Sequence, residues 1–237
     1  MTWSRLVCAA TTVGAMCMAA MPAPAQAQTV AAVITPAPPP EVAPAPVPAV
    51  QHVTLTTTQG DVIIAVEIER APISAANFLR YVDTRRLDGV TFYRAMDLGR
   101  GYGLIQGGTR GMPRITYPPI AHEPTSRTGL SHTDGAISFA RLAPGTASGD
   151  FFITVGALTS LDAQALGSGG DSDGFAVFGR VVQGMDVVRA IMAAPTDPNA
   201  GEGVMRGQMI AAPVRIATAR RSAAPVVAVA VPPVPVP

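Results

Sequence analysis

The proline and glycine residues of this 237-residue chain lie in different parts of the sequence, which limits the part that can fold. Residues 1–50 hold nine of the 23 prolines and residues 225–237 hold five, whereas 22 of the 23 glycines lie within residues 51–221. The middle part therefore has nearly twice the usual glycine share of about 7%. This distribution predicts one turn-rich globular domain between two proline-rich ends.

Residues 1–27 have the pattern of a cleavable secretory signal. Arg5 precedes an apolar stretch from Leu6 to Met21, and Ala25-Gln26-Ala27 is a small-x-small cleavage motif. The mature chain is therefore expected to begin at Gln28 and to be exported. A transmembrane anchor is the alternative, because the uncharged stretch is long enough, but two prolines after it favour cleavage.

The two ends contribute little that can fold or react. Cys8 and Cys17 both lie in the signal segment, so the mature chain is expected to contain no cysteine and no disulfide. Residues 28–50 and 222–237 consist mostly of Ala, Pro and Val, a composition that favours extended polyproline II and cannot bury a core. We interpret them as a linker and a disordered tail.

Charge and metal-ligand spacing exclude several classes of function. The formal charge is +1, and all 17 basic residues are Arg, so the chain has no strongly basic surface for nucleic acid or anionic membranes. His52, His122 and His132 have no zinc-ligand spacing. Residues 171–174 resemble the start of a calcium loop but lack the required later Glu. No metal or cofactor is expected.

The domain shows alternating and β-branched runs that predict a mainly β fold. Pro72 suits the first turn of a helix with an apolar face, and a second helix is expected at 185–193. Eight short strands in this order predict a closed antiparallel barrel with two capping helices. The expected strands are residues 53–56, 62–68, 90–94, 104–106, 136–140, 151–155, 175–181 and 214–218.

Nine short segments of the domain resemble the cyclophilin family of peptidyl-prolyl cis-trans isomerases, in the family's order along about residues 52–218. They are Thr56–Asp61, Ala71–Phe78, Val90–Arg94, Ile105–Gly108, Gly135–Arg141, Asp150–Ile153, Ser160–Asp162, Phe175–Val181 and Gly184–Val188. Each segment alone is weakly specific, and their common order carries the resemblance. The fold it implies is the same closed eight-stranded barrel.

The resemblance implies non-covalent catalysis by Arg94. Twisting an X-Pro amide costs about 18–20 kcal/mol because resonance is lost. The chemistry needs an apolar pocket for the proline ring and a hydrogen-bond donor for the prolyl nitrogen, which gains a lone pair as the amide twists. By resemblance Arg94 is that donor, and an Arg side chain is always charged and always a donor. Without the resemblance, the alternative is a surface Arg on an edge strand.

The resemblance also implies eight substrate-binding residues. They are Phe152, Gln106, Leu104, Ala140, Arg141, Asp150, Leu161 and Phe175. Phe152 would form the floor of the proline pocket, with its neighbour in the Phe-Phe pair facing the core. Gln106 would bind substrate backbone and Leu161 would close the pocket side. The alternatives are a plain turn residue for Gln106 and ordinary core packing for Leu161.

Some residues depart from the family's pattern. Eleven residues separate Arg94 from Gln106, where the family usually has seven. The family's Phe-Met pair in this segment aligns with Gly103-Leu104, so one aromatic wall of the pocket is missing unless Tyr102 replaces it. Asp150 stands where Gln is usual, and we expect it either to orient Arg94 or to engage it in an ion pair.

These features together predict an exported, periplasmic prolyl isomerase of a Gram-negative bacterium. It would be a monomer that acts, without cofactor, on proline-containing segments of secreted or outer-membrane proteins. No nucleic-acid partner and no membrane span in the mature chain are expected. The main alternative is a binding or chaperone module of the same fold with weak or no isomerase activity. A structural envelope protein anchored through its proline-rich ends rests on composition alone.

Overall fold

The computed structural model describes residues 49–164 and 172–225. The predicted signal segment, most of the linker and most of the tail lie outside these residues. The elements are β1 (Val50–Thr57), β2 (Gly60–Glu67), α1 (Pro72–Asp83), β3 (Thr91–Gly99), β4 (Tyr102–Gly108), α2 (Thr125–Thr128), β5 (Ala136–Phe139), β6 (Asp150–Val155), the 3₁₀ turn η1 (Thr159–Leu161), β7 (Ala176–Gln183), α3 (Met185–Met192), β8 (Thr196–Asp197), the 3₁₀ turn η2 (Gly203–Met205) and β9 (Met209–Ser222).

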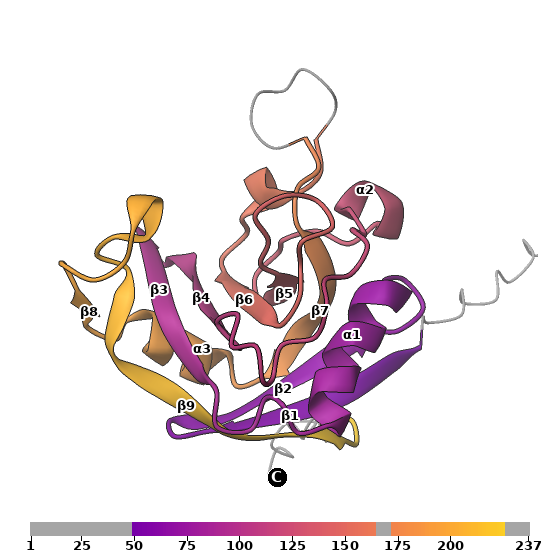
Figure 1. The fold of residues 1–237 in the computed structure, drawn as a ribbon, viewed down its shortest axis with the longest axis horizontal. Coiled ribbons are helices and arrows are strands. Elements are labelled where there is room, and N and C mark those ends of the chain that lie inside the picture. The colour runs from indigo at the N-terminus through magenta and orange to yellow at the C-terminus, as the bar shows by residue number, and fades with distance from the viewer. Residues whose placement is uncertain (1–48, 165–171, 226–237) are drawn as a thin grey trace, which may run out of the picture. The chain divides into compact units, whose positions relative to one another are not determined.

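Eight strands of the described region form a closed antiparallel ring (Figure 1). Their order is β1-β2-β7-β5-β6-β4-β3-β9, and β9 pairs back onto β1. The two-residue strand β8 joins the outside of this ring by pairing with β9. The predicted eight-stranded barrel is therefore confirmed, and closure removes the exposed edges that an open sheet would present.

The segment that is longer than in the family forms the far end of the β3–β4 hairpin. Arg100 and Gly101 connect the two strands with φ values of 56° and 78°. Positive φ at both central residues is the geometry of a type I′ turn, which matches the twist of paired strands. The additional residues therefore lengthen the hairpin, whose register shifts between Asp97 and Gly99, and leave Arg94 paired with Gln106.

Two main helices pack on the barrel, as predicted. Helix α1 begins at Pro72 and packs on β2, β7 and β9, whereas α3 packs on β2, β3, β4 and β6. The backbone N–H groups of Ile73 and Ser74 donate to the buried carboxylate of Glu123, which satisfies the first turn of α1. The single turn α2 was not expected from the sequence. No helix among the described residues has the length and apolarity needed to cross a bilayer.

Two separate apolar clusters lie on opposite faces of the sheet. The larger one fills the barrel and includes Phe151, which is fully buried. The smaller one contains Phe152, Leu104 and Leu158 on the outer face. Because successive residues of a strand point to opposite faces, the Phe-Phe pair supplies one ring to each cluster. This confirms the prediction that only one of the two rings faces the core.

Candidate active site

A row of paired residues crosses the outer face of the barrel. Arg94 of β3 lies opposite Gln106 of β4, which in turn lies opposite Phe152 of β6. Phe152 then lies opposite Ser138 of β5. Directly opposed residues on neighbouring strands project from the same face, so strand register alone brings Arg94, Gln106 and Phe152 side by side.

This row opens into a cleft with a volume of about 1160 Å³. The structure brings all nine residues singled out by the sequence into the wall of this one cleft. They are Arg94, Leu104, Gln106, Ala140, Arg141, Asp150, Phe152, Leu161 and Phe175. Their shared location was expected from the resemblance, and their roles toward a substrate stay predictions.

One half of the cleft is apolar. Phe152 forms its floor and is only 4% exposed. The Phe175 ring stands edge-on to it, with ring centroids 5.4 Å apart and an interplanar angle of 87°. Leu104, Leu161 and Met96 pack around the same two rings. This half offers a flat ring and aliphatic walls, which suit a small apolar group.

A β-bulge in β3 builds the polar half. Phe92 pairs with Gly107 and Arg94 pairs with Gln106, so Tyr93 and Arg94 both face Gln106. Arg94 Nη1 donates to Gln106 Oε1 at 2.7 Å, and Gln106 Nε2 donates to the Tyr93 hydroxyl at 2.8 Å. The amide of Gln106 is therefore committed to orienting Arg94, and its predicted contact with substrate backbone stays a prediction.

Gln208 provides a second bond to Arg94 that the sequence did not reveal. Arg94 Nε donates to Gln208 Oε1 at 2.9 Å, and Gln208 Nε2 donates to the carbonyl of Val204 at 2.9 Å. A backbone bond of 2.9 Å from the N–H of Ala95 to the carbonyl of Gln208 fixes the two chain segments together. Gln208 is 114 residues from Arg94, so no local spacing could have indicated the pair.

The Arg94 guanidinium keeps N–H groups available to the cleft. Its Nη2 also lies 3.8 Å from the sulfur of Met96, a weak acceptor. A guanidinium has five N–H donors, so two of them have no acceptor among the described residues. Burial lowers the pKa of Arg94, while the side chain stays cationic because its usual pKa is very high.

Asp150 does not pair with Arg94, so the prediction of an Asp150–Arg94 interaction is wrong for the described side chains. Asp150 Oδ1 accepts the backbone N–H of Arg110 at 2.7 Å, and burial raises the pKa of the carboxyl. The Arg110 guanidinium lies 4.9 Å above the Tyr93 ring. Asp150 therefore shapes the loop after β4, and Arg94 is held by two neutral amides instead.

Tyr102 does not replace the missing aromatic wall. Its side chain is 46% exposed and packs against Gly156, where an added Cβ would lie 2.5 Å from the ring. Met96 lies opposite Leu104 in the hairpin, and both line the cleft. This wall is therefore formed by flexible aliphatic and thioether side chains.

Arg141 lies on the opposite side of the cleft. Its guanidinium donates to the carbonyl of Gly174 and lies 5.0 Å over the Phe175 ring.

No group of three His, Asp or Glu side chains that could hold a metal occurs in the part of the chain that the structure describes. The cleft thus combines a held cation with an apolar pocket.

Comparisons with known proteins all indicate one family. The family model of the cyclophilin type peptidyl-prolyl cis-trans isomerase/CLD matches residues 52–220. Peptidyl-prolyl cis-trans isomerase A of Dickeya dadantii is 35% identical over 150 residues, which cover 62% of this chain and 73% of the relative. Peptidyl-prolyl cis-trans isomerase B of Escherichia coli is 36% identical over 151 residues, covering 61% and 85% respectively.

Solved structures show the same fold. The crystal structure of a Cryptosporidium parvum cyclophilin type peptidyl-prolyl cis-trans isomerase superposes with a TM-score of 0.57 at 18% identity, covering 75% of this chain and all of that one. A second structure of the Cryptosporidium parvum protein, in the presence of the dipeptide Ala-Pro, has a TM-score of 0.58 at 20% identity, covering 73% of this chain and 99% of that one. The chain therefore belongs to the cyclophilin-type peptidyl-prolyl cis-trans isomerases.

Proposed function

We propose that this enzyme isomerises X-Pro bonds by seating the proline ring on Phe152 while Arg94 donates a hydrogen bond to the prolyl nitrogen. The observation that carries the proposal is the register row in which Arg94, Gln106 and Phe152 lie side by side on one face. An apolar floor and a cation at adjacent positions match a substrate with a ring on one side and a developing lone pair on the other.

The donor acts mainly in the transition state. In the planar amide the prolyl nitrogen shares its lone pair with the carbonyl and is a poor acceptor. As the bond twists, the lone pair localises and accepts from the unengaged N–H groups of Arg94. An interaction that strengthens only at the transition state raises kcat, and each 1.36 kcal/mol gained gives a tenfold faster rate.

The hydrogen bonds that Arg94 donates to Gln106 and Gln208 support this role, because they orient the guanidinium without neutralising its charge. A carboxylate partner would have competed with the substrate nitrogen for the same donors. Amide oxygens bind Nε and Nη1 and carry no net charge. The separation of Asp150 from Arg94 removes one of the two features that favoured a module which binds proline segments without interconverting them. The other feature, Gly103 in place of an aromatic wall, remains.

The exchange of cis and trans forms of an Ala-Pro peptide tests the reaction. Magnetisation-exchange NMR with catalytic amounts of the domain is expected to show interconversion far faster than the uncatalysed time of about 10–100 s. Saturable binding of the peptide with no faster exchange would instead identify a binding module.

The substrates that we propose are proline-containing segments of exported proteins in a bacterial periplasm. The basis is Arg5, the apolar stretch after it and the Ala25-Gln26-Ala27 motif. Intact-mass measurement on protein extracted from a Gram-negative envelope is expected to give a chain that starts at Gln28. A chain that keeps Met1 and remains in the cytoplasm would contradict export.

A further inference from the structure

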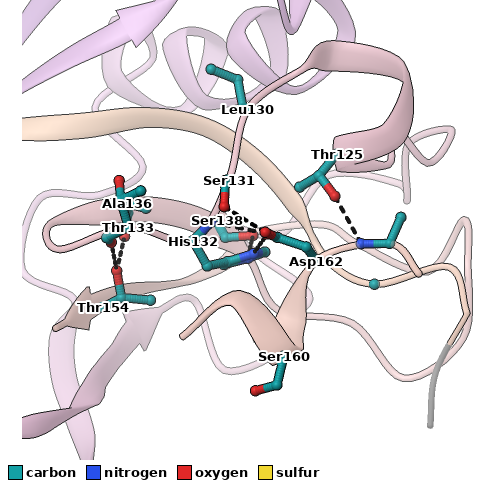
Figure 2. A network of polar contacts seen from close by, with 12 residues as sticks. Thr125, Leu130, Ser131, His132, Thr133, Ala136, Ser138, Thr154, Ser160 and Asp162 are labelled. Carbon is teal, nitrogen blue, oxygen red and sulfur yellow. Dashed lines mark hydrogen bonds and ion pairs between the residues drawn. The ribbon is translucent and has the colours of Figure 1, made fainter. Parts of the chain in front are cut away.

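A polar network around His132 and Asp162 (Figure 2) lies next to Phe152, the floor of the cleft. His132 is fully buried, with Nδ1 2.5 Å from Asp162 Oδ1 and Nε2 3.1 Å from the Ser138 hydroxyl. The same carboxylate accepts the backbone N–H of His132 at 2.9 Å and the hydroxyl of Ser131 at 2.5 Å. Asp162 is therefore satisfied by three donors from one short segment of chain.

This network touches the apolar walls of the cleft. The His132 ring stacks on Phe152, with centroids 5.7 Å apart and an interplanar angle of 9°. The Phe175 ring packs edge-on with the same imidazole, with ring centroids 6.5 Å apart and an interplanar angle of 86°. Asp162 directly follows Leu161, and the backbone N–H of Phe175 donates to the carbonyl of Leu161 at 3.0 Å. Floor and side walls thus meet at one imidazole–carboxylate pair.

The residues have the composition of a hydrolytic triad but lack its access to substrate. Ser138 and His132 are each 0% exposed, and neither lines the cleft. A nucleophilic serine must reach a reacting carbonyl. Ser138 is therefore not placed to attack a substrate in the cleft.

The carboxylate partner of His132 defines which ring nitrogen of the neutral imidazole carries the proton. A carboxylate only accepts hydrogen bonds, so Nδ1 must carry the proton that faces Asp162. In a neutral ring Nε2 is then an acceptor, and it receives the Ser138 hydroxyl. Burial lowers the pKa of His132 and Asp162 opposes that shift, with burial the larger effect.

Other charged groups on the surrounding elements have their own partners. On β6, Asp150 binds the backbone of Arg110. Beyond β5, Arg141 binds the carbonyl of Gly174 and lies over the outer side of Phe175. Asp162 is thus the charged group that acts on His132 among the described residues.

We propose that His132 and Asp162 form a positioning pair for the isomerase cleft, in which a neutral Nδ1-protonated imidazole holds Phe152 while its carboxylate partner holds the turn bearing Leu161. The pair would determine how tightly the proline ring is gripped. This rests on the proposed function of the cleft, because the grip concerns the pocket that we assign to proline.

Two substitutions of His132 separate the ring from its hydrogen bonds. His132→Phe keeps an aromatic ring under Phe152 but loses the donor to Asp162, whereas His132→Asn keeps a donor near the Nδ1 position and loses the stacking. Asp162→Ala removes the acceptor for all three donors, and Asp162→Asn restores an oxygen. Asp134→Ala is the matched control, since Asp134 also accepts a backbone N–H, from Gly156, and an N–H of Arg189, but neither of these partners lines the cleft.

The expected result is a selective change in KM for an Ala-Pro peptide. Asp162→Ala should raise KM about tenfold, the size expected for a lost charged hydrogen bond, with kcat changed by less than about threefold because Arg94 is untouched. Asp162→Asn should recover most of the loss. The proposal would be overturned if Asp162→Ala had the same KM as Asp134→Ala. It would also be overturned if Asp162→Ala lowered kcat by as large a factor as it raised KM.

A measurement on the unmutated protein covers the case in which a variant fails to fold. The side-chain nitrogen shifts of His132 at pH 7 should show a neutral ring protonated at Nδ1, in slow exchange with water. An Nε2-protonated or doubly protonated ring would overturn the proposed pair. Failure of the proposed function is distinguishable, because it would leave this spectrum unchanged while abolishing catalysed peptide exchange.

Discussion

The two halves of the cleft are held in different ways. In the polar half, Arg94 is directed by the neutral amides of Gln106 and Gln208, and it faces the cleft itself. In the apolar half, Phe152 faces the cleft and the ionisable pair of His132 and Asp162 is hidden behind it. Among the described residues, the cation that we propose acts on substrate has no ion-pair partner, and the ionisable pair that we propose supports the pocket does not line the cleft.

This difference between the two halves suggests that the polar half determines kcat and the apolar half determines substrate binding. A guanidinium facing the prolyl nitrogen contributes mainly when the amide is twisted, so it should affect kcat. An apolar floor contacts the proline ring in the planar and the twisted states alike, so it should affect KM. Substitutions in each half test whether the division holds.

The largest effect is expected at Arg94. Arg94→Ala should lower kcat/KM by about one hundred- to one thousand-fold, by analogy with the loss of a donor from an oxyanion hole. Arg94→Lys should recover little, because an ammonium cannot reproduce the two amide bonds and still present a donor. A peptide-exchange assay, with circular dichroism as a fold control, measures both. Rates within about twofold of the unmutated enzyme would reduce Arg94 to a structural residue.

A smaller effect is expected at the floor of the apolar half. Phe152→Ala removes the ring that stacks on His132, and kcat/KM should fall about ten- to one hundred-fold as the apolar contact is lost. Leu142→Ala is the control, since Leu142 also lines the cleft but is 96% exposed. Equal losses in the two variants would contradict a specific pocket at Phe152.

Gln208 tests whether the second amide matters to the polar half. Gln208→Leu keeps the approximate volume but removes the acceptor for Arg94 Nε. The loss of one hydrogen bond to a charged group should lower kcat about three- to tenfold, with little change in KM. Gln183→Leu, at an exposed position of β7, is the control. An effect confined to KM would place Gln208 in substrate binding instead.

Acidification should destabilise the fold through His132, behind the apolar half of the cleft. The pKa of His132 is lowered by folding, so protonation favours the unfolded state. The stability that depends on the neutral ring is complete above the unfolded pKa of about 6.5 and is lost as the pH falls below it. Thermal melts from pH 7.5 to 5 should therefore show a steeper loss in the unmutated protein than in His132→Phe. Parallel curves would mean that the imidazole is not kept neutral by folding.

The smallest effect is expected at Asp150. Asp150→Asn keeps an acceptor for the Arg110 N–H, and Asp150 has no bond to Arg94. Peptide exchange should therefore stay within about twofold of the unmutated rate at pH 7. A rise or fall beyond tenfold would show that the carboxylate acts on Arg94 through a path that the geometry does not contain.

The fold and the residues of the cleft could both be predicted from the sequence, but from different kinds of evidence. Alternating strands separated by glycine turns predicted the barrel, and the Phe-Phe pair placed one ring on each face. The nine cleft residues came from the resemblance, because their convergence depends on strand register across β3, β4 and β6. Register is a long-range property that single segments do not encode.

The partners of those residues were not accessible from the sequence. Gln208 reaches Arg94 because β9 runs beside β3, and Asp162 reaches His132 across 30 residues. The prediction that Asp150 interacts with Arg94 was wrong because the chain after β4 turns. This turn places the backbone N–H of Arg110 2.7 Å from Asp150 Oδ1, so the carboxylate bonds to Arg110 instead. Side-chain partners of this kind depend on bulges and loop paths that composition and spacing leave open.

The most direct test is a comparison of Arg94→Ala and Phe152→Ala in one titration of an Ala-Pro peptide, with cis/trans exchange followed by NMR from low to saturating peptide. If Arg94 acts on the twisted amide and Phe152 grips the ring, Arg94→Ala should lose kcat at nearly unchanged KM. Phe152→Ala should show a raised KM with most of its kcat retained at saturation. Arg94→Ala with full kcat and a raised KM would contradict transition-state donation by Arg94.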